Sequence, residues 1–224
     1  MTTSILSPQV QNHSVENSIQ PKIEGMIDEL SASLPDPKQL TSDQRRGIIA
    51  RYTAVLEGNF IYWMAATLIS VKSEGARPHL LENLFEEVRD AHPVMLRRFA
   101  IAAHAFPTDS DALVVDEDLT KVRKFLGRLS ATQSLATMAF FEGFIQKFMA
   151  YLADLATLQG STDMEYTDVH GVCDIEHTQG LFTALSEEME VNPLNPEADI
   201  FEGVYLLRTL VQTIVFGQTE TLAA

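Results

Sequence analysis

Tyr-Thr-Asp-Val-His-Gly-Val-Cys-Asp-Ile-Glu-His, residues 166–177, is the stretch from which the fold and chemistry of this chain are best inferred. It spaces His170, Asp174 and His177 by four and three residues, which brings the three side chains to one face of an α-helix, spread over about 60°. The rest of that face is apolar, so it is expected to face a helical core, where an unpaired charge is very costly. A metal ion would satisfy two imidazoles and a carboxylate together, and this ligand set suits iron, manganese or zinc. A hydrogen-bonded polar network is the alternative for the same triplet.

Outside this stretch the hydrophobic period is helical along most of the chain, and no segment alternates as a strand would. The predicted fold class is therefore all-α, a bundle of seven to eight helices. Residues 1–20 are polar and lack a period, so they are expected to form a flexible tail, followed by a single helical domain over residues 21–224. The helices are expected at about 21–34, 42–72, 79–89, from 92 to the turn at 107–110, and at 117–127, 129–159, 162–190 and 197–216.

The composition argues against several classes of partner. With 16 Lys and Arg against 31 Asp and Glu, the formal net charge is −15, which disfavours nucleic acid and anionic membrane surfaces because both attract basic patches. No run of 18 apolar residues is present to span a membrane, and the N-terminus does not resemble a signal peptide. Cys173 is the single cysteine, which fits a reducing, cytoplasmic location, and its thiol is interpreted as a packed residue.

A second predicted helix offers a carboxylate to the same core. Glu142 lies in the middle of an apolar stripe with helical spacing. A buried glutamate needs a partner or a raised pKa, and a metal ion would be such a partner. The stripe consists of Leu135, Met138, Ile145, Met149 and Leu152.

Glu57 and the pair Glu87 and His92 are further candidate ligands. Glu57 precedes apolar residues that continue one face of its predicted helix. Glu87 and His92 are five residues apart, so they converge only if the helix ends between them, and Pro93 is consistent with such an end. The other acidic and imidazole side chains are interpreted as solvated faces or hydrogen-bonded core histidines: His79, Glu82, Glu86, His104, Glu176, Glu187 and Glu188.

Taken in order, these segments resemble the haem-oxygenase-like di-iron oxidases and oxygenases, a superfamily related in fold to thiaminase-like and pyrroloquinoline-quinone-synthase-like proteins. The resemblance covers roughly residues 42–190. It rests on Leu-Glu-Asn-Leu-Phe-Glu-Glu at 81–87 with His92, on Met-Ala-Phe-Phe-Glu at 138–142, and on the H-x3-D-x2-H spacing of residues 170–177. The sequence departs from the family where Arg89 replaces the glycine that commonly follows the glutamate pair. Glu86 therefore stays an alternative to the favoured ligand Glu87.

The resemblance implies a haem-oxygenase-like bundle that binds two Fe(II) ions and uses O2 as a co-substrate. Its implied catalytic residues are Glu142 and Tyr166, and Glu57 stands where some branches of the superfamily add a ligand. The implied metal ligands are Glu57, Glu87, His92, Glu142, His170, Asp174 and His177.

The implied substrate is a small molecule. An amino acid or derivative is favoured, especially an aromatic one, converted for example to a nitrile or cleaved at a C–C or C–N bond. A fatty-acid decarboxylase and a para-aminobenzoate-forming enzyme are alternatives within the superfamily. A metal-free thiaminase-like protein and a helical interaction protein are alternatives of a different class, and a homodimer is a candidate assembly. An amino-acid carboxylate would need a basic anchor, for which the candidates are Arg51, Arg123, Lys147 and Arg208.

Overall fold

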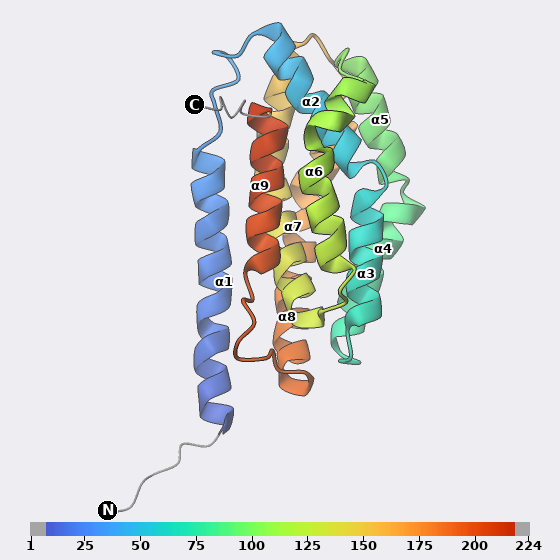
Figure 1. Cartoon of the computed structure of the whole chain (residues 1–224). Helices are drawn as coiled ribbons and strands as arrows, with labels where there is room; N and C mark the ends of the chain where they lie inside the picture. The colour runs from blue at the N-terminus through green and yellow to red at the C-terminus, as the bar shows by residue number, and fades with distance from the viewer. Residues whose placement is uncertain (1–7, 218–224) are drawn as a thin grey trace, which may run out of the picture.

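The computed structural model describes residues 8–217, with side chains from residue 19 onward. Within these residues the chain forms helices and no strand (Figure 1), which confirms the predicted all-α bundle. The helices are α1 (Pro8–Ala32), α2 (Ser42–Leu56), α3 (Asn59–Ser70), α4 (Ala76–Arg89), α5 (His92–Ala102), α6 (Asp109–Leu126), α7 (Ala131–Leu158), α8 (Glu165–Val191) and α9 (Glu202–Phe216). None of the helices in this part of the chain is long and apolar enough to cross a membrane.

Helix α7 is the central element of the bundle. Residues 131–142 are buried without interruption, because this segment is apolar or small around its whole circumference. Helix α8 packs along α7, and α1, α2, α3, α5 and α9 also contact α7. Helix α4 packs on α8 from the other side. The fold therefore places the polar residues of α7, α8 and α4 next to one another in its interior.

The helix predicted over residues 42–72 is in fact two helices. Helix α2 ends at Leu56, and α3 begins at Asn59. Between them Gly58 has φ 87°, a left-handed conformation that costs little for glycine and that interrupts the helical hydrogen bonds. The hydrophobic period continues across this break, which is why the sequence pattern alone does not show it.

The predicted N-terminal tail is too long. Helix α1 begins at Pro8, so residues 8–20 are helical, and residues 1–7 lie outside the described part of the chain. The helix expected from about residue 21 begins earlier, so Pro21 lies inside α1. Ile19 and Ile23 on either side of it are buried in the core, and this burial supports a helix that continues through the proline.

A sharp turn separates α4 from α5. Ala91 has φ 55° and ψ 42°, a left-handed conformation that is uncommon for a residue with a side chain. The turn ends α4 before His92 and starts a new helix there, with Pro93 in its first turn. The helix end expected between Glu87 and His92 is therefore present, and it lets these two side chains converge although they are five residues apart.

Candidate metal centre

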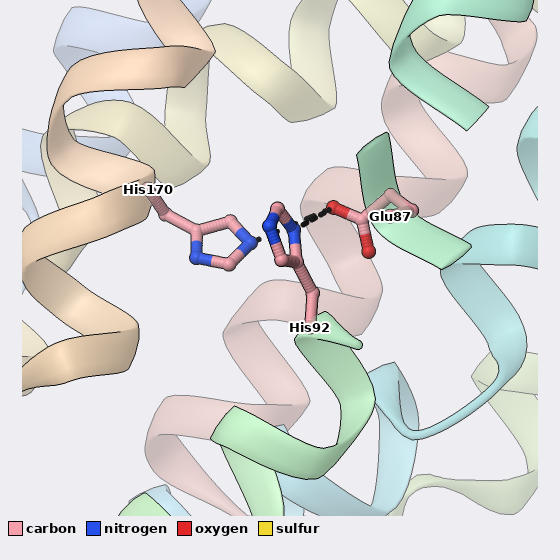
Figure 2. Close-up of side chains that lie close together, drawn as sticks. All are labelled: Glu87, His92 and His170. Carbon is pink, nitrogen blue, oxygen red and sulfur yellow. Dashed lines mark hydrogen bonds and ion pairs between the residues drawn. The ribbon is translucent and has the colours of Figure 1, made fainter. Parts of the chain in front are cut away.

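Three buried side chains from three helices form the first group: Glu87 of α4, His92 of α5 and His170 of α8. Each offers a ligand atom within 4.8 Å of the others. His92 Nδ1 lies 2.7 Å from Glu87 Oε1, and His170 Nε2 lies 3.5 Å from the same oxygen. Figure 2 shows both imidazoles directed at this carboxylate. The arrangement places two imidazole nitrogens and one carboxylate oxygen close enough together to bind the same ion.

Electrostatics favour the ionised form of this carboxylate. Burial raises the pKa of Glu87, but hydrogen bonds from His170 and His92 outweigh burial and lower the pKa to about 2. Burial lowers the pKa of His170, and its hydrogen bond to Glu87 together with the charges of Asp174 and Glu87 reverses that effect and raises it. A negative carboxylate is thus held by the N–H groups of imidazoles. A metal cation would take the place of these protons.

The ring of His170 is oriented by its own helix. Its Nδ1–H donates to the main-chain carbonyl of Tyr166, 2.8 Å away, which leaves Nε2 to face Glu87. Metal-binding histidines commonly donate their second N–H in this way. The Tyr166 ring lies 4.2 Å from the His170 ring, and its hydroxyl is 2.8 Å from the hydroxyl of Tyr52.

The second group consists of Cys173, Asp174 and His177, which lie along one turn of α8. Their ligand atoms are also within 4.8 Å of one another. Asp174 Oδ1 is 3.8 Å from His177 Nδ1, and the Cys173 thiol donates to the same oxygen over 3.3 Å. Asp174 Oδ2 is buried and has no hydrogen-bond partner among the described residues. Because an unpaired buried oxygen of this kind is costly, it supports a missing cation here.

His177 connects the second group to α4. Its Nε2–H donates to Glu86 Oε2 over 3.0 Å. Burial lowers the pKa of His177, but its hydrogen bond to Asp174 and the charges of Glu142 and Asp174 raise it to about 9. Glu86 was interpreted as a solvated residue, and its contact with His177 corrects that. The consecutive residues Glu86 and Glu87 thus serve different groups.

Glu142 of α7 lies between the two groups. Its Oε1 accepts a hydrogen bond of 2.5 Å from the Asn83 side chain. Burial raises the pKa of Glu142 well above its usual value, and the nearby charge of Asp174 adds to this, with His177 opposing it. The Glu142 side chain is also part of the cavity wall beside the first group. Its carboxyl group therefore lies near charged residues of both groups.

The structure does not bring Glu57 to the centre, which corrects the expectation that it is a ligand. Glu57 is the C-terminal cap of α2, directly before the break at Gly58, and it forms an ion pair with Arg97. Its side chain is 29% exposed. Because α2 ends at this break, Glu57 does not lie on the core-facing side of α3.

Cys173, interpreted as a packed residue, also has its sulfur among the potential ligand atoms of the second group. One other expectation is corrected. Glu188 was interpreted as solvated, yet it is 0% exposed and accepts hydrogen bonds from the main-chain N–H groups of Lys72 and Ser73. Glu188 therefore fixes the chain after α3 and has a structural role.

An aromatic cavity adjoins the first group. The free space at its centre is about 20 Å³, room for about one water molecule. No Arg or Lys of the described residues belongs to its wall, so none of the four candidate anchors faces it. Its lining consists of Tyr52, Leu56, Phe60, Ile61, Glu87, His92, Pro93, Leu96, Phe141, Glu142, Ile145, Tyr166 and His170. The anchor candidates bind elsewhere: Arg51 to the Ile214 carbonyl, Arg123 to Asn59, Lys147 to Asp28 and Arg208 to Glu29.

The donor set of the whole centre fits iron. Three carboxylates and three imidazoles meet in the interior, and such mixed oxygen and nitrogen ligands suit iron. The unpaired oxygen of Asp174 supports this fit independently. The six side chains that the structure brings together are Glu87, His92, Glu142, His170, Asp174 and His177.

Comparison with known proteins agrees with this geometry. The chain matches a haem-oxygenase-like family described as "Iron-containing redox enzyme" over residues 49–210, which is more than half of its 224 residues. The matched range contains both ligand groups and Glu142. No curated protein matches the chain significantly. The superfamily resemblance inferred from the sequence is confirmed, and the chain belongs to this family of iron-containing redox enzymes.

Proposed function

We propose that this protein is a non-haem di-iron oxidase or oxygenase that uses O2 to oxidise a small molecule. The observation that carries the proposal is the buried carboxylate of Glu142 between two groups of potential ligands. Family membership supports iron and redox chemistry. Two Fe(II) ions, when bound, would supply the electrons for O2 activation.

The chain's own residues would divide the work of binding. Glu87, His92 and His170 would hold one ion, and Asp174 and His177 would hold the other. Glu142 would contact both, and it would release its proton when the cations bind because they offset the cost of its burial. Asn83 would orient this carboxylate through its hydrogen bond.

The cavity residues would protect the reaction from water. Phe60, Phe141 and Ile145 supply apolar walls beside the first group. The hydroxyls of Tyr52 and Tyr166 bond each other there, and burial raises the pKa of both, so they stay protonated. The main-chain carbonyl of Tyr166 also fixes the His170 ring, whereas the candidate catalytic role of its side chain rests on the hydroxyl in the cavity wall.

An amino-acid substrate, especially an aromatic one, stays a prediction. The aromatic walls favour a largely apolar molecule, and the described cavity wall has no basic side chain to pair with a substrate carboxylate. That carboxylate would therefore face the metal centre. The free space is small, so side chains of the wall have to move when a substrate binds. O2 consumption by the Fe(II)-loaded protein is expected to be faster with tryptophan than with lauric acid, and the reverse order would favour a fatty-acid enzyme.

Anaerobic equilibrium titration with Fe(II), with bound iron quantified before any desalting, tests the proposed function. Two irons per chain are expected in the wild type, with a loss in His170→Ala because the first group loses a ligand. His104→Asn is the matched control, since His104 is exposed and asparagine tolerates its left-handed backbone. Iron content that is low in the wild type, or equal in both variants, would favour a metal-free enzyme or an interaction protein instead.

A further inference from the structure

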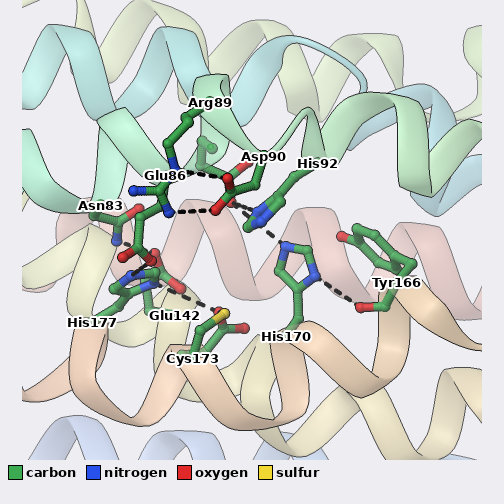
Figure 3. Close-up of polar contacts among 12 residues, drawn as sticks. Asn83, Glu86, Arg89, Asp90, His92, Glu142, Tyr166, His170, Cys173 and His177 are labelled. Carbon is green, nitrogen blue, oxygen red and sulfur yellow. Dashed lines mark hydrogen bonds and ion pairs between the residues drawn. The ribbon is translucent and has the colours of Figure 1, made fainter.

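The two groups of the metal centre adjoin different hollows of the molecule. The first group adjoins the aromatic cavity. Two members of the second group, Cys173 and His177, instead line a depression between α4 and α8. Figure 3 shows these two side chains beside Glu86 of α4. The depression is lined by His79, Glu82, Glu86, Cys173, Glu176, His177 and Gly180.

The thiol of Cys173 is placed as a ligand would be. Its sulfur lies 3.3 Å from Asp174 Oδ1 and belongs to the same compact set of ligand atoms as the carboxylate and the His177 ring. The second oxygen of Asp174 is buried without a partner in the described structure, so this carboxylate still has an unused ligand atom. A cation would bind all three side chains.

The rim of the depression attracts cations. Glu82 and Glu176 are exposed, Glu86 is half-buried, and the residues that line the depression include no Arg or Lys. A cleft lined by one sign of charge raises the local concentration of counter-ions and their association rates by roughly 10- to 1,000-fold. The acidic side chains lead from solvent to His177, because Glu86 is hydrogen-bonded to its Nε2.

We propose that the second group is a cation site in which the Cys173 thiolate is a ligand beside Asp174 and His177, and that its cation arrives through the acidic depression. The inference rests on the proposed function in taking this cation as the second iron. The thiol loses its proton to solvent as the sulfur–metal bond forms. Glu86 keeps the proton on Nε2 of His177, and Nδ1 gives up its own proton to solvent when it binds the cation.

Anaerobic titration of the full-length protein with Co(II) tests the ligand. A cobalt–thiolate bond gives a charge-transfer band in the near ultraviolet, which carboxylates and imidazoles do not produce. Two equivalents are expected to bind, one of them with this band. Cys173→Ser is expected to lose the band and to weaken that equivalent by about tenfold or more, because a ligand is removed. Cys173→Ala repeats the test without a hydroxyl.

The wild-type spectrum separates this inference from the proposed function. Two equivalents without a thiolate band would overturn the role of Cys173 and leave a di-metal centre standing. One equivalent with the band, unaffected by Glu87→Gln, would support the cysteine site and contradict the di-iron proposal. Neither result depends on whether a cysteine variant folds.

Stopped-flow mixing with Co(II) tests the access route. The double variant Glu82→Gln/Glu176→Gln removes two rim charges without touching His177. The thiolate band is expected to form about tenfold more slowly, with a weaker dependence on salt. Glu117→Gln/Glu190→Gln removes two exposed carboxylates outside the depression and is expected to behave as wild type. An equal rate in both double variants would overturn the acidic route.

Discussion

The two halves of the metal centre differ in how they are closed. In the first group all three side chains are buried, and Glu87 is already bonded to two imidazoles. In the second group one carboxylate oxygen is unpaired, and Cys173 and His177 reach an acidic depression. A closed and paired site exchanges its ion slowly, whereas an open and under-paired one binds and releases it readily. We therefore expect the first iron to be retained and the second to exchange.

The largest effect is expected from Glu142→Gln, because this residue alone serves both halves. Glutamine keeps the hydrogen bond with Asn83 but cannot offer a negative oxygen to either cation. O2-dependent turnover is expected to fall below detection, with little loss of stability because the buried carboxyl is replaced by an amide of the same shape. Oxygen-electrode assays and denaturant unfolding measure the two quantities. Normal iron content with normal activity would make Glu142 a structural residue only.

A comparison of His170→Ala with His177→Ala tests the difference between the halves directly. His177→Ala is expected to keep about one iron per chain after desalting, because the first group is intact. His170→Ala is expected to keep less, since the remaining second group exchanges with solvent. Mass spectrometric metal analysis before and after desalting measures both. If His177→Ala lost more iron than His170→Ala, the assignment of the tight site would be reversed.

The two halves are also expected to respond to pH in opposite ways in the metal-free protein. The pKa of Glu87 is lowered to about 2, so its contribution to stability is present above pH 4.5 and is lost as the pH falls toward 2. The pKa of His177 is raised to about 9, so its contribution is complete below pH 6.5 and is lost as the pH rises through 9. The raised pKa of Glu142 adds a loss of stability as the pH rises above 4.5, and that of His170 adds a loss above 6.5. Urea unfolding in EDTA is therefore expected to show greatest stability near pH 4.5, with a decline on both sides.

The matched variant for this pH profile is His177→Asn. It removes the titrating group, so the decline in stability between pH 6.5 and 9 is expected to flatten while the decline at low pH persists. An unchanged alkaline decline would show that His177 is not the group responsible.

Local sequence pattern predicts the first-order features of this centre. The spacing of His170, Asp174 and His177 on one helix requires only the helical period. Glu142 is found because a carboxylate interrupts an apolar stripe. These inferences depend only on residues within a few turns of a single helix.

Local sequence pattern does not predict features that depend on contacts between helices. Glu86 reaches His177 only because α4 packs on α8, 91 residues away in sequence. The role proposed for Cys173 depends on that same packing, which forms a depression beside its side chain. The helix end before His92 is anticipated from Pro93, but the left-handed backbone of Ala91 is not, since alanine rarely adopts it.

The smallest effect is expected from Glu57→Gln, and this variant tests a correction to the sequence-based ligand set. Glu57 pairs with Arg97 at a partly exposed position and does not line the cavity. A surface ion pair contributes about 0–1 kcal/mol, so the free energy of unfolding is expected to change by no more than this. Iron content and O2 consumption are expected to stay at wild-type levels, in contrast to Glu142→Gln, which makes the same chemical change at a buried position. If Glu57→Gln lost one iron per chain, the ion pair between Glu57 and Arg97 would have to break when the metal binds. The break at Gly58 would then be the hinge that allows it, because its left-handed backbone already separates α2 from α3. Equal iron content in Glu57→Gln and wild type, measured under the same loading conditions, would place all metal ligands on the helices after α3.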